Sequence, residues 1–111
     1  MQTSFPIMTT MDPPPGYAVD RVLGACWGIT VRSRSVVGNF VGGIETLFGG
    51  RINTYVELCE NAREEAYDLL IEHAGQIGAN AIIGVHYDAT EVMDGVTEVL
   101  AYGTAVMLEK L

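Results

Sequence analysis

The sequence lacks most of the residue patterns on which enzymes, metal clusters and nucleic-acid binders depend. It has only two cysteines, Cys26 and Cys59, which are too few for a disulfide framework and too irregularly spaced for a zinc ribbon. We expect both thiols to be reduced and to lie in the core. Six basic residues stand against fourteen acidic ones, a net charge of −8, which disfavours nucleic acids and anionic membranes as partners.

Targeting and membrane segments are also lacking. The first ten residues have no basic start of a secretory signal. The longest uncharged apolar stretches are about half as long as a bilayer span requires. We therefore expect a soluble, cytoplasmic protein.

No known catalytic motif is visible in the chain. No nucleophile has a base at a recognisable spacing, and the glycines between positions 38 and 43 do not have the order of a dinucleotide-binding or phosphate-binding loop. The sequence does not predict an enzyme, and it requires no cofactor.

What the chain does contain is a long amphipathic helix, predicted over residues 53–78. Thr54 and Glu57 have the spacing of a capping box, and Gly78 suits the helix end. The predicted helix is about 37 Å long, enough to cross a small sheet. Its apolar stripe consists of Tyr55, Cys59, Ala62, Ala66, Leu69, Leu70, His73 and Ile77.

Several stretches have strand character. Residues 5–10 contain Pro6 and are predicted to form an edge strand, and residues 11–16 form a proline-rich connection. Residues 17–32 form a long strand, with Gly24 and Gly28 as the expected places for a bulge or bend. Two further strands, 79–87 and 97–108, are expected to be joined by a hairpin turn at Asp94-Gly95.

The last two strands are apolar on both faces, so they need cover on both. The long helix supplies one cover, and Ala101, Gly103 and Ala105 offer it a shallow groove. We infer that a second subunit supplies the other cover.

A second, shorter helix is predicted from Ser35, its expected N-cap, to Phe48. Glycines weaken this helix, so close approach by another element must compensate. The residues proposed to make that contact at an oligomer interface are Gly38, Phe40, Gly42 and Gly43.

Several segments together resemble the YbjQ family, also called UPF0145. They are Gly49-Gly50-Arg51, Ala62-Arg63-Glu64, residues 78–85 (GANAIIGV) and residues 103–106 (GTAV). The resemblance implies one α+β domain over residues 1–111, with a core from 17 to 111 and a dodecin-like antiparallel sheet in the order β-β-α-α-β-β. It also implies assembly into a homopentamer, or into a face-to-face decamer. The family has no established function and is often labelled a heavy-metal-binding domain.

Candidate metal ligands are scattered along the chain. Cys26, Cys59, His73 and His86 contain no pair at the spacing of a known metal motif. On the predicted helix, Cys59 and His73 are roughly 21 Å apart, too far to share an ion. His86 and Asp88 lie on one face of a strand, about 7 Å apart. A divalent ion there competes with a simple histidine and carboxylate pair, which we favour.

Three other features have a functional and a structural interpretation. Arg51, beside the start of the long helix, suits either an anion or a glutamate of a neighbouring subunit, and we favour the second. Trp27 and Tyr102 suit either a flat-ligand pocket or the core, and we favour the core. The acidic series Glu60, Glu64, Asp68 and Glu72 suits either a cationic partner or a solvated face, and we favour the solvated face.

These observations predict a cytoplasmic, ring-forming homopentamer whose partner is itself, with room for a small ligand or ion between subunits. The second hypothesis is a heavy-metal-binding module whose ligands come from several subunits. The third is an enzyme with an active site between subunits.

Overall fold

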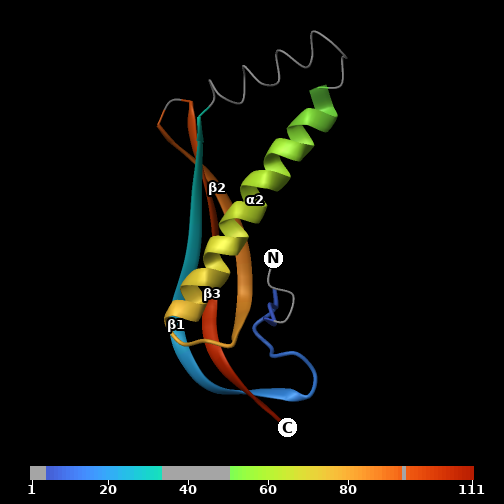
Figure 1. The fold of residues 1–111 in the computed structure, drawn as a ribbon, viewed down its shortest axis with the longest axis vertical. Coiled ribbons are helices and arrows are strands. Elements are labelled where there is room, and N and C mark those ends of the chain that lie inside the picture. The colour runs from blue at the N-terminus through green and yellow to red at the C-terminus, as the bar shows by residue number, and fades with distance from the viewer. Residues whose placement is uncertain (1–4, 34–50, 94) are drawn as a thin grey trace.

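The computed structural model describes residues 5–33, 51–93 and 95–111, with the backbone alone for residues 33 and 51–55. Its elements are β1 (Tyr17–Ser33), α2 (Arg51–Gln76), β2 (Ala81–Met93) and β3 (Val96–Lys110). The strands form one antiparallel sheet in the order β1-β3-β2, and α2 crosses one of its faces (Figure 1). This confirms the α+β class, the antiparallel sheet and the long helix.

The predicted short helix lies outside the described residues. Among the described helical residues, none forms a stretch long and apolar enough to cross a bilayer.

The N-terminal segment is an edge element, but it is not a full strand. It makes an isolated parallel bridge between Ile7 and Ile82 of β2. The Met8 N–H donates to the Ile82 carbonyl at 2.9 Å, and the Ile82 N–H donates to the Pro6 carbonyl at 3.1 Å. Pro6 has no N–H and contributes only its carbonyl, as expected at an edge. The described chain therefore has one strand before α2, where the prediction had two.

The irregularity of β1 predicted at Gly24 is confirmed, whereas the one predicted at Gly28 is not. The pairing register with β3 shifts between Val19 and Arg21 and again between Val22 and Gly24. Gly24 adjoins the second shift and has a φ of 123°, a value that only glycine adopts freely. Pairing continues without a shift through Gly28, so the bulge predicted there is wrong.

The helix prediction is correct in extent and needs correction at its start. α2 begins at Arg51, so Thr54 lies within the helix and not at its N-cap. The predicted end is confirmed, because Gly78 has a φ of 91° and its N–H donates to the Gly75 carbonyl at 3.1 Å. The following N–H, of Ala79, donates to the carbonyl of Ala74 at 3.0 Å.

The last two strands form the predicted hairpin, and both are longer than predicted. β2 continues to Met93 through exposed residues, because β3 remains beside it as a ladder partner. Gly95 has a φ of 77°, as a tight hairpin turn requires. Asp94 lies outside the described residues.

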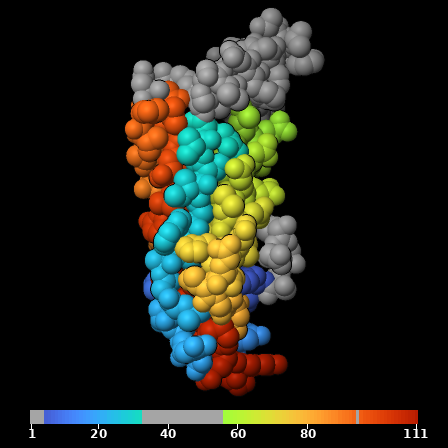
Figure 2. Space-filling view, turned by 60° about the vertical axis from the view of Figure 1, so that its left-hand side comes forward, coloured from blue at the N-terminus to red at the C-terminus, as the bar shows by residue number. Residues whose placement is uncertain are grey.

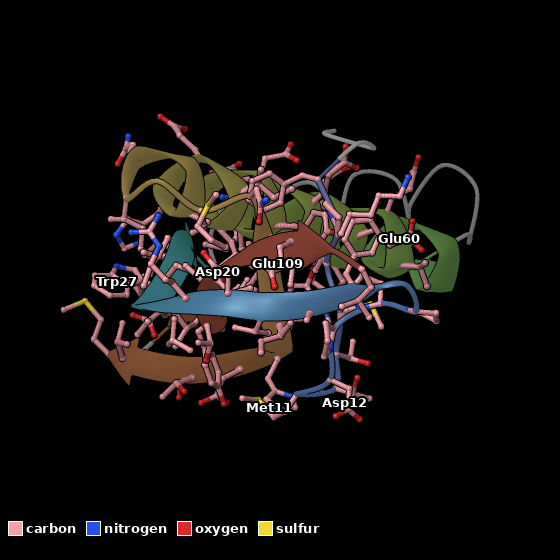
Figure 3. All side chains as sticks on the ribbon, turned by 90° about the horizontal axis from the view of Figure 1, so that it is seen from below. Met11, Asp12, Asp20, Trp27, Glu60 and Glu109 are labelled. Atoms are coloured by element: carbon pink, nitrogen blue, oxygen red, sulfur yellow. The ribbon has the colours of Figure 1, made fainter. Side chains whose placement is uncertain are left out.

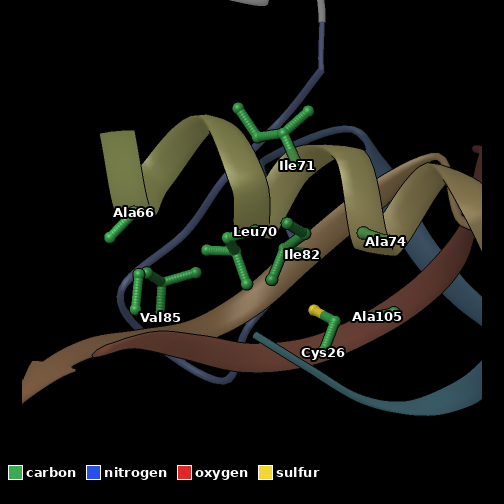
Figure 4. Close-up of a cluster of buried hydrophobic side chains, with 9 residues drawn as sticks. Cys26, Ala66, Leu70, Ile71, Ala74, Ile82, Val85 and Ala105 are labelled. Carbon is green, nitrogen blue, oxygen red and sulfur yellow. The ribbon is translucent and has the colours of Figure 1, made fainter. Parts of the chain in front are cut away.

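The core lies between α2 and the sheet and is built from small side chains (Figure 4). The helix contributes Ala62, Ala66, Leu70, Ile71 and Ala74, all buried. Ala101 and Ala105 of β3 are also buried, which confirms that β3 offers the helix a shallow surface. The predicted helix stripe is too wide, however, because Leu69 and Ile77 are exposed. Cys59 is exposed as well, so its assignment to the core is wrong.

The helix and the sheet approach each other closely at Gly28. A Cβ at this position would overlap the Ala66 carbonyl oxygen and the Leu70 backbone nitrogen, and it would lie 2.9 Å from the Leu69 carbonyl carbon. All three atoms belong to the backbone of α2, which cannot move locally without bending the helix. Gly28 is therefore the position that sets the distance between α2 and β1.

A polar network ties the next part of β1 to the same helix. The Thr30 hydroxyl donates to Oε1 of Glu65 at 3.0 Å, and the Arg32 guanidinium donates to Oε2 at 2.9 Å. Arg32 also donates to the Thr30 hydroxyl oxygen at 2.7 Å. These bonds lower the pKa of the Glu65 carboxyl below its ordinary value of 4.5, the bond from Arg32 contributing most.

Replacing Gly28 by alanine should destabilise the fold by about 1 to 3 kcal/mol, because the new methyl group must push two backbones apart. Urea unfolding followed by circular dichroism at one protein concentration measures this loss. Gly75→Ala is the matched control, since a Cβ at Gly75 meets nothing within 4 Å. Gly75→Ala should leave the free energy of unfolding unchanged or raise it by up to about 1 kcal/mol, because alanine has the higher helix propensity. Equal stability of Gly28→Ala and wild type would contradict the close contact.

The pH dependence of stability should reveal the Glu65 network. Because the folded pKa of Glu65 is below 4.5, its contribution is complete above pH 4.5 and is lost as the pH falls through the lower folded value. Glu65→Gln should therefore melt at a lower temperature than wild type at pH 7, with a difference that shrinks in acid. Glu64→Gln removes an equal charge from the same helix. If the melting temperature of Glu64→Gln differed from that of wild type by the same amount, and this difference also shrank in acid, the pH dependence could not be assigned to Glu65.

Candidate functional site

The sheet face opposite α2 carries apolar side chains that are largely exposed in its middle part, although Trp27, at the β1 edge of this face, also contacts His73 of α2. Cys26, Gly28 and Thr30 face the helix, so the residues that alternate with them on β1 point to the other side. We call this other side the open face. Its described middle part consists of Trp27, Ile29 and Val31 of β1, Leu100 and Tyr102 of β3, and His86 and Asp88 of β2.

The exposures on the open face are large for apolar side chains. Trp27 is 49% exposed, Ile29 42% and Val31 52%, and Tyr102 in the central strand is 40% exposed. Towards the other end of the same face, Ala81, Ile83, Val106 and Leu108 form a second buried cluster, against which Met8 packs. The N-terminal segment thus covers one end of the face and leaves the middle bare.

The candidate metal ligands His86 and Asp88 lie on this open face, and both are exposed. The His86 ring lies 5.9 Å from the Tyr102 ring, centroid to centroid. Among the described residues, no group of three His, Cys, Asp or Glu side chains is close enough to hold a metal ion. Two donors on one strand do not complete a coordination sphere. The described residues of a single chain therefore do not fit a bound heavy metal.

The other predicted soft ligands are separated from this pair and from each other. Cys26 is buried, and its thiol donates to the Gly103 carbonyl with a sulfur to oxygen distance of 3.7 Å. Burial raises the pKa of Cys26 to about 11, so the thiol keeps its proton at neutral pH. Cys59 is exposed on the surface of α2. A thiolate cluster within the chain is therefore excluded for these two residues.

His73 makes a contact that sequence reasoning missed. Its Nδ1 accepts the backbone N–H of Trp27 at 3.1 Å, and its ring meets the indole edge to face with centroids 4.4 Å apart. With Nδ1 acting as acceptor, the neutral imidazole carries its proton on Nε2 and is a hydrogen-bond donor there. The two residues are 46 positions apart, so no local pattern could have paired them.

A shallow pocket of about 310 Å³ adjoins this contact, between β1 and α2. Trp27 lies at the margin of the molecule (Figure 3), and the pocket runs beside it. Apolar and polar groups both line it, namely Trp27, Gly28, Ile29, Leu69, Glu72, His73 and Gln76. The favoured assignment of Trp27 and Tyr102 to the core is wrong, because they are 49% and 40% exposed. The two are cross-strand partners, but the pocket beside Trp27 is lined by His73 and not by Tyr102.

The acidic series on α2 forms a neighbouring groove of about 350 Å³, which shares Leu69 and Glu72 with the pocket. Its other lining residues are Asn61, Glu64, Glu65 and Asp68. Glu60 is exposed and does not line it. Glu65 is bound to Arg32, and the Arg63 guanidinium lies 5.5 Å from the centre of the Tyr87 ring. Carboxylates on one helix do not by themselves form a cation site. Their exposure agrees with the prediction of a solvated face.

The remaining candidates are beyond what the structure describes. Arg51 is the first residue of α2, but its side chain is not among those described. The predicted interface residues Gly38, Phe40, Gly42 and Gly43 lie outside the described residues. Their roles stay predictions.

The described fold resembles that of a solved structure. It is the crystal structure of a protein of unknown function that belongs to the DUF74 family, from Pediococcus pentosaceus. It superposes with a TM-score of 0.53 over 93% of this chain and 96% of that one, at 18% sequence identity. At this identity the likeness concerns the fold alone.

Sequence comparison is more specific. A "UPF0145 protein" of Chromobacterium violaceum is 59% identical over 105 residues, which cover 95% of this chain and 90% of that protein. Another of Burkholderia thailandensis is 58% identical over 100 residues, or 90% of each chain. Residues 6–109 match the YbjQ family model, described as "Putative heavy-metal-binding". The chain therefore belongs to the YbjQ family, also called UPF0145.

Proposed function

We propose that this protein is a cytoplasmic ring-forming homopentamer that holds a small ligand or ion where its subunits meet. The bare middle of the open face is the observation that supports this assembly most directly. Burying one large apolar side chain contributes roughly 1.5 to 3 kcal/mol. Several such side chains on one sheet face mark a surface that another protein covers. A second copy of the same chain can provide this cover without any other protein.

The first turns of α2 support the same proposal. Between Val56 and Asn61 no side chain is buried, and Val56 is 49% exposed. In Figure 1 this part of the helix extends away from the sheet, which it contacts only further along. An isolated helix end gains little stability from its sequence alone, so a neighbouring subunit is a natural support for it.

The second candidate is a heavy-metal-binding module, which the family description favours. His86 and Asp88 are the described residues that would serve it, because both are exposed on one face of the same strand. Since one chain supplies too few donors, a site of this kind needs ligands from two or more subunits. Association of subunits is therefore a requirement of both candidates.

Assembly should be visible in the mass of the purified protein. We expect about 60 kDa by light scattering, five times the 12.0 kDa of one chain, or twice that mass for a decamer. Trp27 is the only tryptophan and is 49% exposed in the isolated chain. Its fluorescence should therefore shift to longer wavelength as dilution dissociates the ring. A monodisperse 12 kDa species at micromolar concentration would contradict the proposal.

Metal content separates the two candidates. The ring proposal without a metal role predicts far less than one metal ion per subunit after treatment with a chelator, measured by elemental analysis. The metal-binding module predicts retained stoichiometric metal that His86→Ala removes. His73→Ala is the matched control, because His73 already uses Nδ1 to accept the Trp27 N–H. Loss of metal in both variants alike would point to instability and not to ligation by His86.

A further inference from the structure

The pocket between β1 and α2 has two walls of different chemical character. Figure 2 shows β1, in blue to cyan, and α2, in green to yellow, side by side along one surface of the molecule. On the strand side the pocket is lined by Trp27, Gly28 and Ile29, and on the helix side by Leu69, Glu72, His73 and Gln76. All seven residues belong to one chain, so the pocket needs no second subunit to be complete.

The indole of Trp27 is held in place although half of its surface is exposed. Its backbone N–H donates to Nδ1 of His73 at 3.1 Å, and the His73 ring contacts the indole edge to face. The close approach of α2 to Gly28 fixes the distance between strand and helix at the same level. An exposed aromatic ring that is already positioned loses little conformational entropy when a ligand binds against it.

The helix side of the pocket combines apolar and hydrogen-bonding groups. Leu69, Glu72 and Gln76 are three and four residues apart, so their side chains emerge on one face of α2. Glu72 and Gln76 are one turn apart, about 6 Å along the helix axis, and each has a side-chain oxygen that accepts hydrogen bonds. Leu69 and Ile29 add apolar surface next to these acceptors.

The Glu72 carboxylate gives the pocket a negative charge that the other lining residues do not offset. No lysine or arginine lines the pocket, and within the described part of the chain Glu72 forms no ion pair. Arg32 is bound to Glu65 instead, at a nitrogen to oxygen distance of 2.9 Å. His73 accepts the Trp27 N–H at Nδ1, so its imidazole is neutral in this contact. A cation is the complement that this pocket lacks.

We infer that the pocket binds a small organic cation, namely a primary ammonium group on a short apolar stem. The ammonium group donates to the Glu72 carboxylate and to the Gln76 amide oxygen, and its charge lies against the Trp27 ring. The stem lies on Leu69 and Ile29. This site goes beyond the ligand proposed between subunits, because one chain supplies every part of it.

Other classes of ligand fit the pocket less well. An anion would meet the Glu72 carboxylate and the net charge of −8 on the chain. A metal ion lacks a coordination sphere, since no group of three donors is present among the described residues. A neutral apolar molecule would remove water from the carboxylate and give it no partner in return. A volume of about 310 Å³ suits a small molecule and not a dinucleotide.

Binding can be measured directly, because Trp27 is the only tryptophan of the chain. Its fluorescence is titrated with n-butylammonium chloride at neutral pH and constant ionic strength, and in parallel with 1-butanol and with sodium butyrate. We expect a saturable change with butylammonium and a dissociation constant of about 1 mM or lower. The neutral and anionic analogues should bind at least about tenfold more weakly. Equal binding of butanol, or tighter binding of butyrate, would overturn a cation site.

Two charge substitutions localise the site on α2. Glu72→Gln removes the charge, keeps the size and helix propensity of the side chain, and should weaken butylammonium binding by about tenfold. Glu60→Gln is the matched control, because Glu60 is exposed on the same helix and does not line the pocket. It lies roughly 18 Å from Glu72 along the helix, beyond the screening length of about 8 Å. Equal weakening in both variants would assign binding to the general surface charge and overturn the site.

The contribution of the indole is tested with Trp27→Leu and Trp27→Phe, both titrated by calorimetry. Each variant keeps the backbone N–H that His73 accepts. Trp27→Leu should weaken butylammonium binding by about tenfold, whereas Trp27→Phe retains an aromatic face and should lose less. Circular dichroism confirms that the variants are folded. Wild-type affinity in folded Trp27→Leu would overturn the role of the ring.

Measuring the mass of the protein in the same samples separates this site from the proposed ring. Single chains obtained by dilution should still bind butylammonium, because one chain supplies the whole pocket. Binding by a protein that is monomeric throughout would support the pocket and overturn the ring alone. Binding that requires the assembled ring would overturn a site within one chain. No saturable binding by rings or by single chains overturns the pocket and leaves the ring proposal standing.

Discussion

The contact between the α2 backbone and Gly28 is the constraint on which the rest of the structure depends. Because α2 approaches so closely there, its buried stripe must consist of small residues such as Ala62, Ala66 and Ala74. The same contact fixes the helix over β1 and leaves its first turns beyond the sheet. It also determines which strand residues face the helix, and so which apolar residues face away from it.

The sequence predicted the elements better than their contacts. Periodicity found α2 within two residues at each end, and Gly78 was identified as its stop for the right conformational reason. Periodicity cannot say how far along its stripe a helix touches the sheet. Cys59 and Leu69 have core spacing, yet both are exposed.

The candidate site was less predictable, because its contacts join distant residues. The bond between Trp27 and His73 spans 46 positions, and the pair of Arg32 and Glu65 spans 33. Gly28 was noticed for the right reason, its lack of a side chain, but the wrong consequence was drawn from it. A glycine in a strand permits either a bulge or a close neighbour, and only the position of α2 decides between them.

The large negative charge of an assembled ring affects how metal binding by the protein must be interpreted. Five chains of −8 carry a formal charge of about −40, with six carboxylates per chain on α2 alone. Repulsion of this kind is screened over about 8 Å at physiological salt, so a ring is stable only if the acidic helix faces lie apart and towards water. Such a surface attracts divalent cations without coordinating them. Retention of metal at low salt would therefore reflect this surface charge. Only metal held at high salt, and lost with a named ligand, would establish a coordination site.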